Sequence, residues 1–226
     1  KLAADKGHPE AITFYAKIAL SIEIIEDYSG LLINHLLIAV FGFLVIPDSV
    51  TQIGSSSFQG CHFFDGTLVL SKNLVSINSC AFENCDNFKG SLILPDSIAY
   101  IDTRAFKGCS GFDGELTLPN NNKFSFISSH TFEDCSGFIG SLTIPENVTE
   151  INKYAFNGCK NFNGNLYLSK KLKYIREKAF NGCSSFSGSL IFPDSLMTIE
   201  NGAFKNCMNF DGSLIIPDLI TTIHSE

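Results

Sequence analysis

Cysteine is the residue type that offers most chemistry in this 226-residue chain, because thiols can form disulfides or bind zinc. Seven of the eight cysteines begin the motif Cys-x-x-Phe-x-Gly, spaced 24 residues apart except for one interval of 26. They are Cys61, Cys85, Cys109, Cys135, Cys159, Cys183 and Cys207. Side chains at one repeat position point the same way, which does not suit disulfide geometry, and zinc-type Cys pairs are absent. We therefore predict a column of buried free thiols.

The other reactive side chains form no recognisable catalytic pattern. Cys80 lies outside the motif, and its repeat equivalents vary in type, so we expect it to be exposed and to react first. A Cys80–Cys85 bridge stays open as an alternative. The five histidines share no repeat position and form no triad or metal pattern. The sequence thus predicts no catalytic, cofactor-binding or metal-binding residue, and no enzyme.

A fixed period of this length indicates a solenoid, in which each unit buries its apolar face against its neighbours. In the unit from Ser91 to Gly114, Leu92 and Leu94 alternate with Ile93 as in a half-buried strand, and Pro95 ends it. The Ala-Phe segment before each cysteine is expected to form a short helical turn. A left-handed residue, Gly, Asn or Asp, should close that turn. Stacking then creates two columns of seven phenylalanines.

This unit resembles the leucine-rich repeat of the BspA-like family, Leu-x-Ile-Pro-x-x-Val-x-x-Ile-x-x-x-Ala-Phe-x-x-Cys-x-x-Leu, over about residues 43–226. The chain differs in having Phe where that family has Leu after the cysteine, and in its corner glycine. The resemblance implies a right-handed curved solenoid, rich in β-structure and with parallel strands. It also implies surface or secreted proteins of bacteria and parasitic protists that adhere to host matrix and to other cells.

The domain organisation follows from these boundaries. Residues 43–226 should form seven full repeats and a partial eighth, and residues 1–42 a helical N-terminal segment and cap. Within that segment, residues 1–22 resemble part of a Sel-like helical repeat. The apolar run 31–46 is shorter than the about 20 residues that a membrane-spanning helix needs, so membrane contact is not expected. A net charge of −7 and a pI near 5.2 argue against a nucleic-acid partner.

Function is expected where the repeats differ on the surface. Two exposed columns supply the candidate binding residues: Ile93, Tyr167 and Ile191 in one, and Tyr100, Phe126, Glu150 and Tyr174 in the other. Asn147 begins a glycosylation sequon that matters only in a secreted protein. A two-residue insertion around residues 120–123 should bulge outward.

These features predict a non-enzymatic protein that binds protein ligands, with no small-molecule substrate and no cofactor. Adhesion at the cell surface is the leading hypothesis. The alternative is a cytoplasmic scaffold that combines helical and leucine-rich repeats, favoured by the unpaired cysteines.

Overall fold

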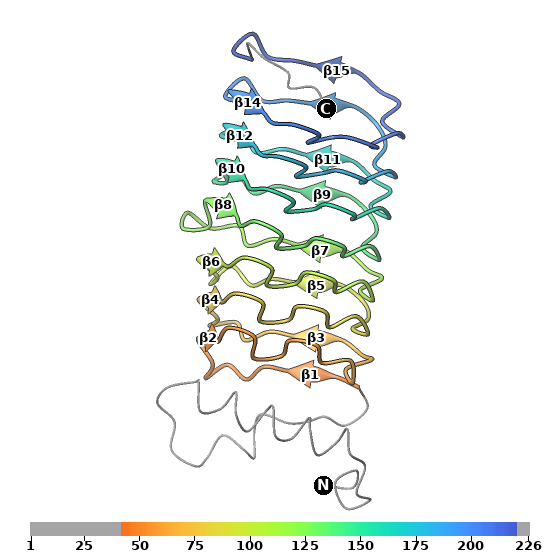
Figure 1. The fold of residues 1–226 in the computed structure, drawn as a ribbon. Coiled ribbons are helices and arrows are strands. Elements are labelled where there is room, and N and C mark those ends of the chain that lie inside the picture. The colour runs from red at the N-terminus through yellow and green to blue at the C-terminus, as the bar shows by residue number, and fades with distance from the viewer. Residues whose placement is uncertain (1–41, 221–226) are drawn as a thin grey trace, which may run out of the picture.

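The protein is a β-solenoid of about seven turns with a period of about 24 residues, as predicted (Figure 1). The computed structural model describes residues 42–220. Each coil contributes two two-residue strands. The first strands define the odd face: β1 (Leu44–Val45), β3 (Leu68–Val69), β5 (Leu92–Ile93), β7 (Leu116–Thr117), β9 (Leu142–Thr143), β11 (Leu166–Tyr167), β13 (Leu190–Ile191) and β15 (Leu214–Ile215). The second strands define the even face: β2 (Gln52–Ile53), β4 (Ser76–Ile77), β6 (Tyr100–Ile101), β8 (Phe126–Ile127), β10 (Glu150–Ile151), β12 (Tyr174–Ile175) and β14 (Thr198–Ile199).

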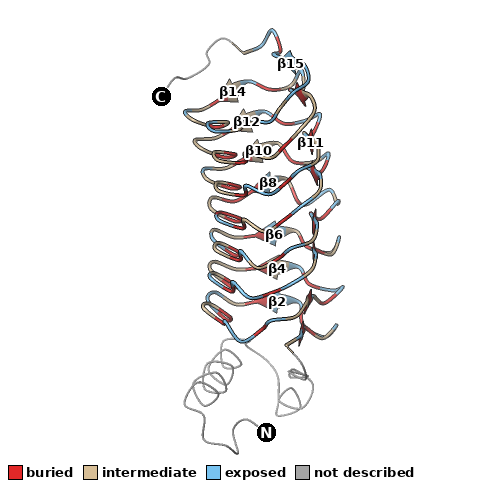
Figure 2. Cartoon of the chain, turned by 90° about the vertical axis from the view of Figure 1, so that its right-hand side faces the viewer, coloured by how far each residue is buried: buried red, intermediate tan, exposed pale blue. Residues whose placement is uncertain are grey.

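The strands are half-buried because alternate side chains point to opposite sides of the backbone. On the odd face the first residue of each strand from β1 to β13 is buried and the second is exposed. On the even face the first residue of each strand is exposed or half-buried and the second is buried. The buried residues recur at the same places in successive coils (Figure 2). Both faces thus present one outward column of side chains each.

Two columns of phenylalanine fill the core, as the repeat predicts. Within each column the rings stack nearly parallel, with centroids 5.1 Å apart for Phe58–Phe82 and 5.5 Å for Phe88–Phe112. The columns meet edge to face, as in the Phe82–Phe88 pair at 70°. Both arrangements are the ones that aromatic rings prefer over a face-to-face sandwich. The two stacks therefore set the register of the coils as well as supplying the apolar core.

The segment before each cysteine is not a short helical turn, so that prediction was wrong. Alternate N–H groups bond to the next coil (Cys80 N–H to Thr103 O, 3.0 Å), while the others close tight turns (Glu83 N–H to Cys80 O, 3.1 Å). A helix would direct all its N–H groups back along its own chain. The predicted left-handed residue before the cysteine is confirmed, and a second occurs four residues earlier, for example Cys80 (φ 57°) and Asn84 (φ 59°).

Six of the seven motif cysteines, those from Cys85 to Cys207, join their coil to the preceding one through the thiol. The S–H of Cys109 donates to the carbonyl of Phe82 at 3.0 Å, and that carbonyl also accepts the N–H of Cys85. Equivalent thiol bonds of 2.9–3.1 Å occur at Cys85, Cys135, Cys159, Cys183 and Cys207. The thiols are thus small buried donors as well as apolar groups, a role that the sequence alone did not predict.

The strands of the odd face pair two by two: β1 with β3, β5 with β7, β9 with β11, and β13 with β15. Between the pairs, β3 and β5, β7 and β9, and β11 and β13 share no ladder. We call these three gaps the seams. They are visible in Figure 1 as wider spaces between successive odd strands.

The corner glycines explain the pairing, because their conformation alternates from coil to coil. Gly90 has a φ of 75°, and its N–H bonds forward to the Asp113 carboxylate at 2.7 Å rather than back to the preceding coil. Lys89 N–H makes the backward bond instead, to Gly66 O at 2.8 Å. At the next corner Gly114 N–H bonds directly to Gly90 O at 3.1 Å. This one-residue offset at every second corner prevents a ladder across the seam.

The even face is interrupted once, between β6 and β8. There the predicted insertion projects as a loop beside β8 (Figure 1). Asn121 fixes the loop: its amide donates to Asp96 O and Ile98 O, and its oxygen accepts the N–H of Phe124. The extra residues therefore displace β8 enough to lose the ladder to β6 while the Phe columns continue beneath it.

The described residues contain no helix, and none of them forms an apolar helix of membrane-spanning length. The predicted helical segment 1–42, including the Sel-like stretch 1–22, lies outside the described residues apart from residue 42. No comparison supports the Sel-like prediction.

Candidate functional site

The outward column of the odd face is apolar at most positions although it is exposed. The exposed fraction is 64% for Ile93, 53% for Tyr167 and 56% for Ile191. Val45 and Val69 continue the column in the first coils, and Thr117 and Thr143 occupy its centre. Aligned apolar side chains at the surface are typical of interaction sites.

The three predicted residues of this column lie at the edges of seams. Ile93 borders the β3–β5 seam opposite Val69, and Tyr167 and Ile191 face each other across the β11–β13 seam. The β11–β13 seam is hollowed into a cavity of about 560 Å³. Its lining residues are Asn165, Leu166, Tyr167, Leu168, Lys170, Gly188, Ser189, Ile191 and Pro193. The exposed apolar column and a concave site therefore coincide at the sixth and seventh coils.

The even-face candidates lie on the other strand face, and their part in binding stays a prediction. Tyr100, Phe126, Glu150 and Tyr174 belong to the even strands, and the first two meet edge to face at 5.8 Å. Six residues that include a turn separate the two columns in each coil except the fourth, where eight do, so the columns lie on different faces of the solenoid.

The other two even-face candidates, Glu150 and Tyr174, both contact Arg176. Its Nε donates to Glu150 at 2.5 Å, and its guanidinium carbon lies 4.6 Å from the Tyr174 ring centroid. A second bond, from Nη1 to Glu200 Oε1, is 2.9 Å long. Glu150 and Tyr174 are thus engaged within the molecule, which leaves them less available to a ligand than the odd-face residues.

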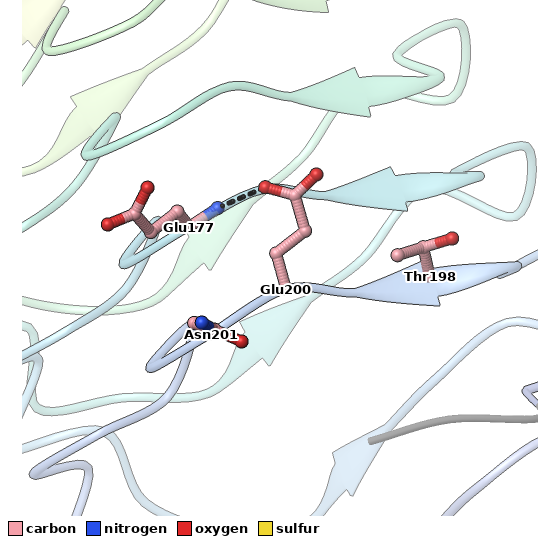
Figure 3. A pocket seen from close by; sticks show the side chains of 4 residues that line it. All are labelled: Glu177, Thr198, Glu200 and Asn201. Atoms are coloured by element: carbon pink, nitrogen blue, oxygen red, sulfur yellow. Dashed lines mark hydrogen bonds between the residues drawn. The ribbon is translucent and has the colours of Figure 1, made fainter. Parts of the chain in front are cut away.

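A shallow hollow of about 290 Å³ lies beside Glu200, lined also by Glu177, Thr198 and Asn201 (Figure 3). Glu200 accepts the backbone N–H of Glu177 at 2.9 Å as well as the Arg176 bond. Burial raises the pKa of this carboxyl, but the bonds from Arg176 and from the Glu177 N–H outweigh it and hold the pKa below its ordinary value. Glu200 is therefore an ionised group that joins two coils. A general acid would instead need a raised pKa, so that it keeps its proton.

No group of three or more His, Cys, Asp or Glu within residues 42–220 could hold a metal ion. All eight cysteines are free. The period cysteines from Cys61 to Cys183 are buried, whereas Cys80 and Cys207 are half-buried. Burial raises the pKa of the Cys80 thiol, and it raises the pKa of Cys207 to about 12. Raised pKa values lower the thiolate fraction, and the thiolate is the nucleophile.

We therefore expect a thiol reagent at pH 8 to modify native Cys80 first, Cys207 more slowly, and the six buried cysteines only on unfolding. Mass spectrometry of timed samples measures the order, and a Cys80→Ser variant should remove the fast phase alone. Rapid modification of a buried residue such as Cys109 would contradict the closed thiol column.

The sequon asparagine is held by hydrogen bonds on both sides of its amide. Asn147 Nδ2 donates to Asn121 O at 3.2 Å, and its Oδ1 accepts Lys171 Nζ at 2.9 Å. Glycosylation at Nδ2 would replace the first of these bonds. The modification stays a prediction that depends on secretion.

The sequence prediction missed Lys170, Ser189 and the other polar residues that line the seam. The signal is the residue before each corner glycine, which alternates between Asp or Asn (Asp113, Asn163) and other types (Lys89, Ile139). These Asp and Asn side chains accept the glycine N–H of the preceding coil. The Asp or Asn therefore occurs in every second coil, one coil after each seam glycine, and marks where the seams lie.

Comparison with known proteins agrees with this architecture. The sequence profile described as "BspA type Leucine rich repeat region (6 copies)" matches residues 41–163 and 163–226. No curated protein matches the chain.

Two solved structures are similar in fold. The crystal structure of a T. pallidum leucine-rich repeat protein has a TM-score of 0.66 at 21% identity, covering 82% of this chain and 85% of that one. A leucine-rich repeat protein from Bacteroides ovatus has a TM-score of 0.62 at 27% identity, and the match covers 76% of this chain and 42% of that one. The repeat profile, which matches residues 41–226, shows that the chain belongs to the BspA-type leucine-rich repeat family.

Proposed function

We propose that this protein binds other proteins through the outward column of the odd face, and that it does so in adhesion at the cell surface. The observation that carries the proposal is the exposure of Ile93, Tyr167 and Ile191 in one aligned column, two of them beside a hollow. Apolar and aromatic side chains at a concave site are the usual anchors of protein interfaces. Repeat proteins commonly bind through such extended surfaces.

A binding experiment tests the surface. Threonine occurs naturally in this column at Thr117 and Thr143, so the triple variant Ile93→Thr, Tyr167→Thr, Ile191→Thr should fold. Beads coated with the wild-type protein should adhere to immobilised extracellular-matrix proteins or to cultured host cells. The triple variant should lose at least tenfold in adhesion, because three anchors are removed.

The control is Ile139→Thr, which alters a comparably exposed isoleucine in another column. It should leave adhesion unchanged. The adhesive function would be refuted if the triple variant and Ile139→Thr lost adhesion equally, or if beads with the wild-type protein did not adhere. Proteolysis of intact cells tests the location separately, since a surface protein should be cleaved without lysis.

A second candidate function is that of an intracellular scaffold, which the free cysteines favour. Eight thiols without a disulfide persist most readily in a reducing compartment. Protection from external protease together with retained partner binding would select this function.

A further inference from the structure

The β11–β13 seam leaves unpaired the backbone groups that are paired inside each strand pair of the odd face. Leu142 N–H bonds to Asn165 O at 3.0 Å and Ile144 N–H to Tyr167 O at 2.8 Å, which joins β9 to β11. The equivalent N–H groups of Leu166 and Leu168 make no backbone bond to β13 in the described part of the chain. Unpaired donors beside a cavity favour a ligand that carries hydrogen-bond acceptors.

The charge of this region distinguishes it from the rest of an acidic protein. The sixth coil, residues 165–188, contains Lys170, Lys171, Lys173, Arg176 and Lys178 against the single carboxylate Glu177, a net charge of +4. The coil before it is neutral and the coil after it, residues 189–212, carries −2. The whole chain carries −7. All of these cations lie between residues 170 and 178, so the hollow borders a basic segment of the coil.

Lys170 is the cation that lines the hollow itself, and it is exposed. No ion pair joins it to a carboxylate among residues 42–220, although Glu146 occupies the equivalent place in the preceding coil. The apolar part of the lining comes from Tyr167, Ile191 and Pro193. An unpaired cation, backbone donors and an apolar edge thus lie in one concave site.

We propose that the β11–β13 seam binds an acidic peptide segment of the partner protein, with apolar residues between its carboxylates. The carboxylates pair with Lys170 and with the unpaired N–H groups of the β11 edge. The apolar side chains pack between Tyr167 and Ile191. This inference rests on the proposed protein-binding function and specifies the chemistry of the partner.

The β3–β5 seam provides an internal control because its edges have the same design. Val69 and Ile93 replace Tyr167 and Ile191, and Lys72 stands in the place of Lys170. However, Lys72 Nζ is paired with Asp48 at 2.8 Å, which holds the pKa of the lysine above its ordinary value and that of the Asp48 carboxyl below it. The second coil, residues 67–90, is neutral overall. This seam should therefore not attract an acidic ligand.

Fluorescence anisotropy with a labelled twelve-residue peptide of alternating Glu and Leu tests the proposal. Wild-type protein should bind it at low salt, and binding should weaken as salt screens the charges. Lys170→Glu should weaken binding at least tenfold, whereas Lys72→Glu should change it less than twofold. Both lysines lie on exposed turns, and unchanged thermal unfolding midpoints would show that both variants fold.

Other outcomes overturn the proposal in distinguishable ways. Equal effects of the two substitutions, or equal binding of a Lys-Leu peptide, would show that the seam does not select acidic ligands. Competition by a single-stranded oligonucleotide of the same charge at the same concentration would favour a nucleic acid over a peptide. If Lys170→Glu leaves bead adhesion intact while the odd-face triple variant abolishes it, the adhesive function stands and the seam inference falls.

Discussion

Replacing Phe112 by alanine should destabilise the protein by about 3–5 kcal/mol, the usual cost of truncating a fully buried phenylalanine. Phe112 is fully buried, and its ring lies between those of Phe88 at 5.5 Å and Phe138 at 5.3 Å. Removing the ring leaves a cavity in mid-column and interrupts the stack on both sides. Because each coil contacts only its neighbours, the loss falls on two interfaces at once.

Urea unfolding followed by circular dichroism measures the effect. Phe63→Ala is the matched control, because the same atoms are removed from a ring that is 45% exposed, and it should cost about 1 kcal/mol or less. A loss below about 1 kcal/mol for Phe112→Ala would mean that the column is not the core. A broadened, two-step transition would show that the two halves of the solenoid unfold separately.

The second large effect is expected at the corner glycines, which fall into two classes. A Cβ at Gly114 would lie 2.6 Å from Ser91 N and 2.7 Å from Gly90 C, so the preceding coil must move. Gly114→Ala should therefore cost about 3 kcal/mol, at the upper end of overpacking effects. A Cβ at Gly90 would contact only Thr67 Cγ2, at 3.3 Å. Gly90→Ala should therefore lower the stability by about 1–2 kcal/mol, the cost of holding alanine at a φ of 75°.

Four alanine variants make the comparison decisive. Gly114→Ala and Gly164→Ala should form the costly class, because Gly164 faces Ser141 N at 2.8 Å. Gly90→Ala and Gly140→Ala should form the milder class. Unfolding free energies from urea titration give the result, and four equal values would contradict the alternating corner.

The fold and its core were predictable from the sequence because their determinants recur at every coil. The Phe columns, the left-handed residue before each cysteine and the buried thiols follow from residue types at fixed positions. The turn around Cys80 was mispredicted because its second left-handed position holds glycine only at Gly202, and in the other coils Ser, Cys, Arg, His, Tyr or Lys. Interactions between neighbouring coils, and not local propensity, hold that conformation.

The candidate site was predictable only in part. Exposure of Ile93, Tyr167 and Ile191 follows from strand alternation, and the structure bears it out. The engagement of Glu150 and Tyr174 by Arg176 could not be inferred, because Arg176 stands at a different repeat position from both and reaches Glu150 in the preceding coil. The seams were missed because they recur every two coils. A consensus of single 24-residue units merges the two types of corner glycine and hides their alternation.

The alternating corner also limits how the length of this array can change. Duplication or loss of one 24-residue copy would place two corners of the same type in succession. Gly90-type corners need an Asp or Asn acceptor in the following coil, and Gly114-type corners need a Gly90-type partner behind them. Adding or removing an odd number of repeats therefore leaves one corner glycine without the partner that its hydrogen bond needs. An even number keeps the two corner types in alternation. Unequal crossing-over in a gene for this protein would conserve the fold most readily in steps of two repeats.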